Sequence, residues 1–386
     1  MSQSFSSFIP PTRVLMGPGP SDVYTRVLEA LSRPTIGHLD PKFVDLMDEV
    51  KQLLQYAFQT NNTLTMPISA PGSAGMESVF VNLVEPGDKV IVCQNGVFGG
   101  RMQQNVQRCG GQAIMVQDKW GEPTCLNKVR EALQANPDVK ALAFVHAETS
   151  TGVLNDAKAL CQLAKEFDCL SIVDAVTSLG GSELKVDEWH IDAIYSGTQK
   201  CLSCVPGLSP VSFSDKAIAV IKQRTHPVQS WFLDMDLVMG YWGRGGLEKK
   251  GKGKGKGAKR AYHHTAPVNS IYALHESLLI LHKEGLQPTH ARHLKNHLSL
   301  KAGLEKLGLE FVVDQAYRLP QLNMVSIPEG VDDGQVRSRL LNEFNLEIGA
   351  GLGELAGKVW RIGLMGCGSS QKNVDYCISS LESVLD

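Results

Sequence analysis

Lys200 is expected at a position where its amine is partly desolvated. Lys200 ends the polar stretch 195–200, Tyr-Ser-Gly-Thr-Gln-Lys, which follows the strand-like run 191–194. Partial desolvation of an amine at the end of a buried strand lowers its pKa, and the neutral amine can attack a carbonyl to form a Schiff base. A lysine in a Ser/Gly turn is more often a surface residue, so the chemical interpretation needs support from its neighbours.

An aspartate stands at the end of a second strand-like run. Residues 169–173 are mostly apolar and lead directly into Asp174, which small residues follow. A carboxylate at the tip of a buried strand needs a cationic or hydrogen-bonding partner, because an unpaired buried charge is costly. The protonated ring nitrogen of pyridoxal phosphate is such a partner, and this cofactor also bonds to a lysine. Asp174 alone fits a helix cap, but together with Lys200 it favours pyridoxal phosphate.

Further residues offer a phosphate site, a stacking surface and a cationic clamp. The small-residue loop 72–75 leads into a helix expected over 76–83, and N–H groups at such a helix start bind phosphate. Phe98 could stack on a flat ring, and Thr149 could donate a hydrogen bond to a phenolate oxygen. Arg361 lies among apolar residues, where a guanidinium needs a carboxylate partner. Taken singly, each also fits a structural role as a plain turn, a packed side chain or a structural ion pair.

The elements that must position these residues alternate along the chain. Strand-like segments are expected over 89–92, 112–116, 141–145, 170–173, 191–195 and 209–213, and helical ones over 100–109, 126–134 and 156–167. This alternation predicts an α/β fold with a mostly parallel central sheet and helices on both faces. Ligands of such sheets bind beyond the carboxyl ends of the strands, where Asp174 and Lys200 are expected.

The chain is long enough for two domains. It has 386 residues, and single cores stop growing near about 250 to 300 residues. We expect an N-terminal arm over 1–15, a large domain that binds the cofactor over 16–272, and a smaller C-terminal α+β domain over 273–386.

Composition narrows the partners and the location. The formal net charge of −2 gives no general attraction to nucleic acid or to an anionic membrane, so neither partner is expected. Nine scattered cysteines and no recognisable leader predict reduced thiols and a cytoplasmic location. Cys201 and Cys204 form a Cys-x-x-Cys, but no second pair follows at zinc spacing, so no metal site is expected. The Lys/Gly run 249–260 is expected to be a solvated loop.

Several short segments carry a resemblance to a known family. They are residues 16–21, 146–152, 173–181, 196–200, 262–265 and 359–363. In these segments the chain resembles the class-V, fold type I aminotransferases that use pyridoxal phosphate, above all the alanine-glyoxylate and serine-pyruvate group. The resemblance runs from about Val14 to the C-terminus and implies the fold type I architecture.

The resemblance implies roles around the cofactor ring. Lys200 would hold pyridoxal phosphate as a Schiff base and, once displaced by substrate, move the substrate α-proton. Asp174 would pair with the ring nitrogen, Phe98 would stack on the ring, and Thr149 would bond the ring oxygen.

The resemblance also implies how phosphate and substrate are held. The phosphate ligands would be Ser73, the Ala74 amide and Gln199, joined by Tyr262 and Thr265 from the partner subunit. The implied assembly is a homodimer with shared active sites. Arg361 would clamp the substrate carboxylate, with Gly17 and Gly19 behind it.

We therefore expect transamination from a small amino acid, alanine or serine, to glyoxylate or pyruvate. Only one arginine is placed for a carboxylate, which favours small substrates. Alternatives on the same fold are a kynurenine-pathway or phosphonate transaminase, or a cysteine desulfurase with Cys367 as its thiol. From another class, the run 249–260 would suit an RNA- or phosphate-binding protein that has lost catalysis, although Lys200 and Asp174 argue against it.

Overall fold

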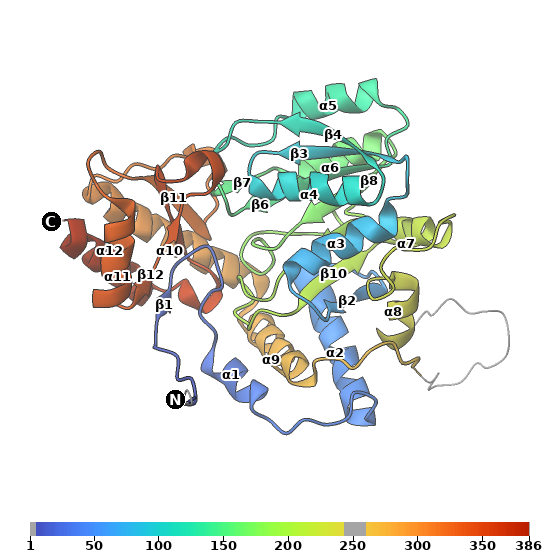
Figure 1. The fold of residues 1–386 in the computed structure, drawn as a ribbon, viewed down its shortest axis with the longest axis horizontal. Coiled ribbons are helices and arrows are strands. Elements are labelled where there is room, and N and C mark those ends of the chain that lie inside the picture. Colours follow the sequence, from blue (N-terminus) through green and yellow to red (C-terminus); the bar gives the residue numbers. More distant parts are fainter. Residues whose placement is uncertain (1–4, 243–259, 386) are drawn as a thin grey trace.

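A seven-stranded sheet forms the centre of the large domain in the computed structural model, which describes residues 5–242 and 260–385 (Figure 1). The described strands lie in the order β2 (Leu64–Ile68), β10 (Ser209–Phe213), β9 (Ala193–Tyr195), β8 (Leu170–Asp174), β5 (Ala141–Val145), β3 (Lys89–Gln94) and β4 (Gln112–Gln117). Neighbours from β9 to β4 are parallel, and β10 runs antiparallel to both β2 and β9. The predicted mostly parallel sheet is confirmed.

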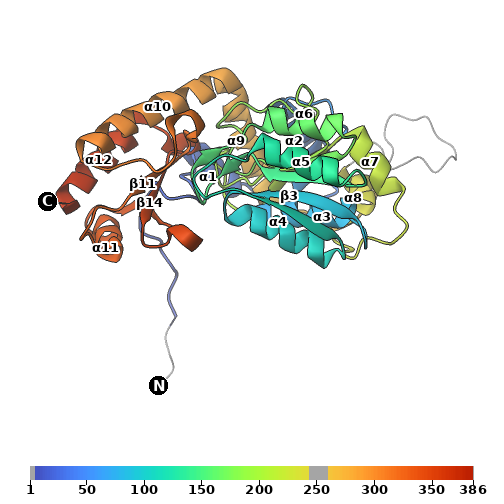
Figure 2. The same ribbon diagram turned by 90° about the horizontal axis from the view of Figure 1, so that it is seen from above.

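Helices cover both faces of this sheet. Figure 2 shows α3 (Gly72–Leu83) and α4 (Val97–Arg108) on one face, and α2 (Pro41–Phe58) and α6 (Ala157–Glu166) on the other. The other helices of this part are α1 (Thr25–Leu31), α5 (Leu126–Ala135), α7 (Asp215–Lys222), α8 (Met235–Trp242) and α9 (Val268–Glu284). Every residue of β5 and of β8 is buried. Two covered faces explain why these strands are continuous apolar runs without alternation.

A smaller unit has a core of its own. Its described strands β11 (Leu322–Ser326), β14 (Val359–Gly363) and β13 (Gly349–Ala350) form an antiparallel sheet with β14 in the middle. Its helices are α10 (Leu286–Lys306), α11 (Asp333–Glu343) and α12 (Gln371–Leu385), drawn orange to red in Figure 1. Trp360 and Ile362 of β14 pack in this second core with Leu300 and Leu381. The sheet thus carries Arg361, the residue between them in the chain.

The N-terminal segment joins the two units. β1 (Val14–Leu15) pairs in parallel with β12 (Leu346–Glu347) of the smaller unit, and Met16 packs in the second core. Before β1 the chain extends away from the body, with Phe5 and Phe8 exposed (Figure 2). The segment after β1 returns to the large domain, because the Ser21 amide donates to the Gln199 carbonyl at 2.9 Å.

The expected domain boundary at residues 272 and 273 falls inside α9. Apolar residues on both sides of that point, among them Ile271, Leu274 and Leu281, pack in the larger core. Gly285 separates α9 from α10 and has a φ of 86°. We therefore propose Gly285 as the end of the large domain.

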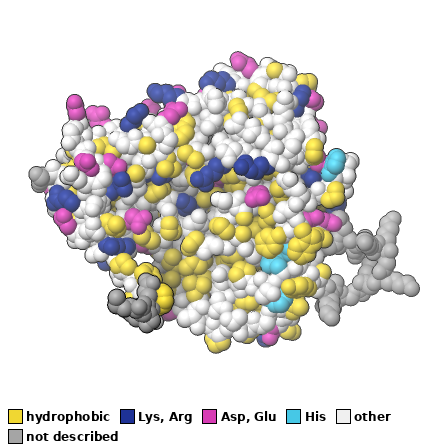
Figure 3. Space-filling model, in the orientation of Figure 1, with side chains coloured by type: hydrophobic (Ala, Val, Ile, Leu, Met, Phe, Trp, Pro, Cys, Tyr) yellow, Lys and Arg dark blue, Asp and Glu magenta, His cyan; other side chains and the backbone are white. Residues whose placement is uncertain are grey.

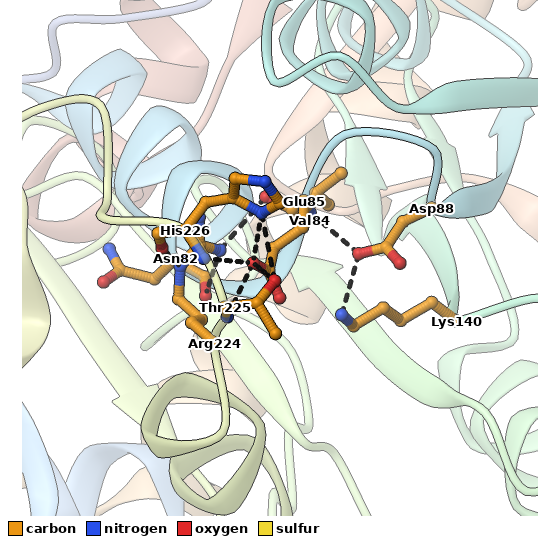
Figure 4. Close-up of polar contacts among 8 residues, drawn as sticks. All are labelled: Asn82, Val84, Glu85, Asp88, Lys140, Arg224, Thr225 and His226. Atoms are coloured by element: carbon orange, nitrogen blue, oxygen red, sulfur yellow. Dashed lines mark hydrogen bonds and ion pairs between the residues drawn. The ribbon is translucent and has the colours of Figure 1, made fainter.

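A polar network ties the connection between α3 and β3 to the segment after α7 (Figure 4). Glu85 Oε1 accepts hydrogen bonds from the Thr225 amide and hydroxyl at 2.9 and 3.0 Å and from the His226 amide at 2.8 Å. Arg224 donates to the carbonyls of Asn82, near the end of α3, and of Val84, just after it. Burial alone would raise the pKa of Glu85, but the bonds from His226 and Thr225 outweigh it and hold the pKa at about 2.

Three further findings concern the Lys/Gly run, membrane-spanning helices and metal sites. The Lys/Gly run 249–260 lies, except for Arg260, outside the described residues. Within residues 5–242 and 260–385, no helix is long and apolar enough to cross a membrane. The same residues contain no group of three or more His, Cys, Asp or Glu side chains that could hold a metal ion.

Candidate active site

Lys200 lies in the loop after β9, with its side chain buried. The residue is 8% exposed, and Nζ donates a hydrogen bond to the carbonyl oxygen of Pro18. Burial lowers the pKa of Lys200 to about 8, and the positive charge of Arg361 acts in the same direction. A larger fraction of this amine is therefore neutral and nucleophilic near physiological pH than of an ordinary lysine.

Asp174 is the last residue of β8, beside β9. It is 2% exposed and pairs in the ladder with Tyr195, while its Oδ1 accepts a hydrogen bond from the Val176 amide at 2.8 Å. Burial raises the pKa of Asp174 to about 7, and the charge of Lys200 acts in the opposite direction. A carboxylate in this position would be stabilised by a cation beside it.

The start of α3 lies against the loop that follows β9. A side chain added at Gly72 would contact the Ser196 carbonyl oxygen at 3.5 Å and Gly197 Cα at 3.6 Å, so glycine permits this close approach. Ser73, in the first turn of α3, is exposed. The Ala74 amide, predicted to bind phosphate, donates to the Pro71 carbonyl at 2.7 Å. The Gly72 and Ser73 amides therefore suit an anion better than the Ala74 amide does.

Gln199 adds a polar group next to the lysine. Its side-chain oxygen is buried and has no hydrogen-bond partner among the described residues. An unpartnered buried amide is costly, and a ligand that completes its hydrogen bonds would remove that cost. This open acceptor suits a hydrogen-bond donor, whereas the predicted contact with a phosphate would have to come from the Gln199 side-chain N–H.

Phe98 and Thr149 lie at the edges of the same region. Phe98 is in the first turn of α4, half-buried, with the Arg101 guanidinium 4.8 Å from its ring centroid. Thr149 is 3% exposed and follows β6 (Ala147–Glu148), which forms a hairpin with β7 (Val153–Leu154). Their backbones are tied together by Glu148, whose Oε2 accepts a hydrogen bond from the Phe98 amide at 3.3 Å.

Arg361 reaches this region from the smaller unit. It is 6% exposed, and its guanidinium donates to the carbonyl oxygens of Ala350 at 2.7 Å and of Thr149 at 3.1 Å. Burial lowers its pKa to about 10, and it has no ion pair with any residue in the described part of the chain. The structural ion pair considered for Arg361 is thus not formed there. A guanidinium in this state can bind a substrate carboxylate through two parallel hydrogen bonds.

Gly17 and Gly19 lie on the segment that crosses in front of the lysine. A side chain added at Gly19 would lie 2.4 Å from Lys200 Nζ, whereas one added at Gly17 would be 3.6 Å from its nearest neighbour, Glu347. Ser21 Oγ donates to the Lys200 carbonyl at 2.8 Å. This segment therefore packs directly on Lys200, and its positive φ at position 19 favours glycine there.

Tyr262 and Thr265 do not join the site within one chain. Both are exposed, and Tyr262 contacts the His38 ring, with the centroids 5.4 Å apart. Between them, His263 stacks on Trp231 with a centroid distance of 4.4 Å. Figure 3 shows histidine side chains beside hydrophobic ones on the face of the large domain in view. The two residues thus remain candidates for a site on another subunit.

Sequence reasoning assigned no role to Glu148, the carboxylate closest to the assembled residues. It is fully buried, and its charge acts on both Arg361 and Asp174. The sequence feature that pointed to Glu148 was its position in segment 146–152, immediately before Thr149 and close to the end of an apolar strand.

The residues present fit pyridoxal phosphate. The elevated pKa of buried Asp174 calls for a cation such as the protonated ring nitrogen, and the Lys200 amine is desolvated. The α3 start offers backbone N–H donors for a phosphate. The charges of Arg361 and Asp174 both act on the Lys200 amine, so both lie near it.

Comparisons with known proteins agree with this geometry. Residues 20–376 match the family model "Aminotransferase class-V". The chain is 40% identical to an alanine–glyoxylate aminotransferase of Oryctolagus cuniculus over 97% of this chain and 93% of the relative. It is 35% identical to an (S)-ureidoglycine–glyoxylate transaminase of Bacillus subtilis over 97% and 91% of the two chains.

Solved structures show the same relationship. The crystal structure of an alanine–glyoxylate aminotransferase from Nostoc sp. is 44% identical and superposes with a TM-score of 0.94 over 100% of this chain and 98% of that one. A cysteine desulfurase from Thermococcus onnurineus is 14% identical with a TM-score of 0.75, which shows a shared fold alone. The predicted fold type I architecture is confirmed. This chain belongs to the class-V aminotransferases, pyridoxal-phosphate-dependent enzymes.

Proposed function

We propose that the enzyme transfers the amino group of a small amino acid, alanine or serine, to glyoxylate or pyruvate. The observation that carries the proposal is the buried Arg361 guanidinium, which has hydrogen bonds only to backbone carbonyls and suits one substrate carboxylate. The names of two relatives supply the acceptor, because both the rabbit and the Bacillus enzymes are named for glyoxylate.

The proposed chemistry assigns each buried group a task. Lys200 would hold the cofactor through its amine, and the same amine, whose pKa burial lowers in the protein alone, would carry the proton of the substrate α-carbon once it is free. When bound, pyridoxal phosphate supplies an electron sink for the electrons left on that carbon. Asp174 keeps the ring nitrogen protonated, because an adjacent carboxylate favours the charged form.

Further residues orient the ligands in this proposal. Phe98 stacks on the ring and Thr149 bonds the ring oxygen. Ser73, the α3 start and Gln199 hold the phosphate, and the free Gly72 and Ser73 amides support this assignment. Gly17 and Gly19 let the N-terminal segment close over the substrate side of Lys200.

The proposal includes a homodimer with shared active sites. Its support is that Tyr262 and Thr265 are exposed in one chain and lie beside exposed Trp231 and Phe232, an apolar surface suited to a second copy. A cytoplasmic location is proposed because all nine cysteines are free thiols. Size-exclusion chromatography with light scattering tests the dimer.

The test of the activity is direct. Purified enzyme incubated with alanine and glyoxylate should form pyruvate and glycine in equal amounts, and Lys200→Ala should form neither. Absence of both products with the unmodified enzyme would overturn the proposed substrates. Sulfide release from cysteine would favour a desulfurase, but burial raises the pKa of Cys367 and its thiol donates to the Asp22 carbonyl, so no observation favours that activity.

A further inference from the structure

Glu148 is a fully buried carboxylate surrounded by donors. Its Oε1 accepts from the Ser150 amide at 3.0 Å and from Ser150 Oγ at 2.6 Å, and its Oε2 accepts from the Phe98 amide at 3.3 Å. Ser150 Oγ in turn accepts from the Val97 amide at 2.9 Å, so its own proton points to Glu148. The carboxylate therefore only accepts hydrogen bonds, which is the role of the ionised form.

These bonds fix the start of α4. Val97 and Phe98 are its first two residues, and their amides have no intrahelical acceptor. Glu148 binds one of these amides directly and the other through Ser150. A side chain added at the preceding Gly96 would lie 2.4 Å from the Glu148 carboxyl carbon, so the Gly96 backbone packs directly on the Glu148 side chain. The orientation of the Phe98 ring thus depends on Glu148.

The same carboxylate lies next in the chain to Thr149, whose carbonyl accepts a hydrogen bond from Arg361. Burial raises the pKa of Glu148, and the bonds from Ser150 and Phe98 and the charge of Arg361 act in the opposite direction. In return, the charge of Glu148 favours the ionised form of Arg361, which has no ion pair with any described residue and donates to the backbone carbonyls of Ala350 and Thr149.

We propose that Glu148 is a positioning residue that links the two ligand sites: it fixes the Phe98 stacking surface and partly balances the Arg361 charge that binds substrate carboxylate. The inference rests on the proposed function, because it deepens the roles given there to Phe98 and Arg361. It requires that removing the Glu148 charge weaken cofactor binding and strengthen the binding of a simple carboxylate. A general loss of stability would weaken both.

The test measures the two affinities separately. Cofactor affinity is measured by absorbance titration of the cofactor-free enzyme with pyridoxal phosphate, and carboxylate affinity by calorimetric titration of the holoenzyme with propionate. For Glu148→Gln we expect the Kd for pyridoxal phosphate to rise at least about tenfold and the Kd for propionate to fall several-fold. The amide group of glutamine places an N–H against one of the present donors, while the net negative charge is lost.

Two further variants separate the parts of the proposal. Ser150→Ala keeps the Glu148 charge but removes the hydroxyl that holds Val97, so it should weaken cofactor binding and leave propionate affinity unchanged. Glu148→Asp keeps the charge on a shorter side chain, so it should behave like Ser150→Ala and serves if the glutamine variant does not fold. Glu166→Gln, in a surface ion pair with Arg130, should change neither affinity.

The outcomes are decisive for each claim. Propionate affinity that is unchanged or weakened in Glu148→Gln, or tightened in Glu148→Asp, would overturn the charge-balancing role. Cofactor affinity within about twofold of the unmodified enzyme in both Glu148 variants would overturn the link to Phe98. If the unmodified enzyme bound both ligands but produced no pyruvate from alanine, the proposed function would fail while these two readouts still decided the role of Glu148.

Discussion

Replacing Gly19 by alanine should have two effects, backbone strain at position 19 and displacement of the Lys200 amine. Gly19 has a φ of 108°, where residues with a side chain are strained. The added methyl would also lie 2.4 Å from Lys200 Nζ and 2.8 Å from its Cδ. The lysine must therefore move, and its hydrogen bond to the Pro18 carbonyl is lost or distorted.

The two costs have different magnitudes and appear in different measurements. The strain amounts to about 1–2 kcal/mol of unfolding free energy. A displacement of about 1 Å at a reacting group lowers rates by about 10²-fold. We therefore expect Gly19→Ala to lose about 2 kcal/mol of stability in urea unfolding and about two orders of magnitude in kcat/KM.

Gly207→Ala is the matched control. Gly207 has a φ of 127°, but a side chain added there would meet nothing within 4 Å. Its alanine variant should lose a similar amount of stability and keep its turnover. If Gly19→Ala kept kcat/KM within about threefold of the Gly207 variant, the argument that this segment packs on the catalytic amine would be refuted.

Three more substitutions test the electrostatics. Asp174→Asn should stabilise the cofactor-free protein by an amount that grows as pH rises from about 4 to about 7, because burial raises the folded-state pKa of Asp174 to about 7 and its ionisation then costs stability. Urea unfolding of both proteins at pH 5 and pH 8 measures this stabilisation, and a stabilisation that did not change with pH would contradict the prediction. Arg361→Lys should lower kcat/KM for alanine by about 10²-fold, because lysine lacks the planar fork; a loss below about fivefold in steady-state assays would argue against the carboxylate clamp. Glu85→Gln should lower the free energy of unfolding by about 1 kcal/mol at pH 7. Because the folded-state pKa of Glu85 is held at about 2, this difference between the two proteins should shrink as pH falls from 4.5 toward 2. Urea midpoints that differ equally at pH 7 and pH 3 would contradict a stabilising role of the network in Figure 4.

The sheet and the catalytic pair could be predicted because their signals are local. Lys200 and Asp174 each follow a short apolar run, and burial on both faces of a parallel sheet requires such runs. Since parallel neighbours end at the same edge, β8 and β9 bring the two residues to one place. The proposed roles of Lys200 and Asp174 followed from the chemistry of a buried amine and a buried carboxylate, and the roles of the other predicted ligand-binding residues from the family resemblance.

Other features depend on contacts between distant segments. The domain to which α9 belongs could not be predicted, because its apolar stripe does not reveal which of two cores it joins. The Ala74 amide is consumed by the Pro71 carbonyl, a detail of the first helical turn that composition does not determine. Glu148 has a role only because α4, β6 and β14 meet around it, and no spacing along the chain encodes that meeting.

Burial shifts the ionisation of the main site groups in opposite directions. It lowers the pKa of Lys200 to about 8 and of Arg361 to about 10, and it raises that of Asp174 to about 7. Each shift marks a charge that the protein alone does not fully stabilise. A ring nitrogen that is positive and a substrate carboxylate that is negative would complement Asp174 and Arg361, respectively. The protein is therefore less stable without these ligands than with them bound. Ligand binding should raise the free energy of unfolding most at neutral pH, because Asp174 would otherwise begin to ionise there without a partner.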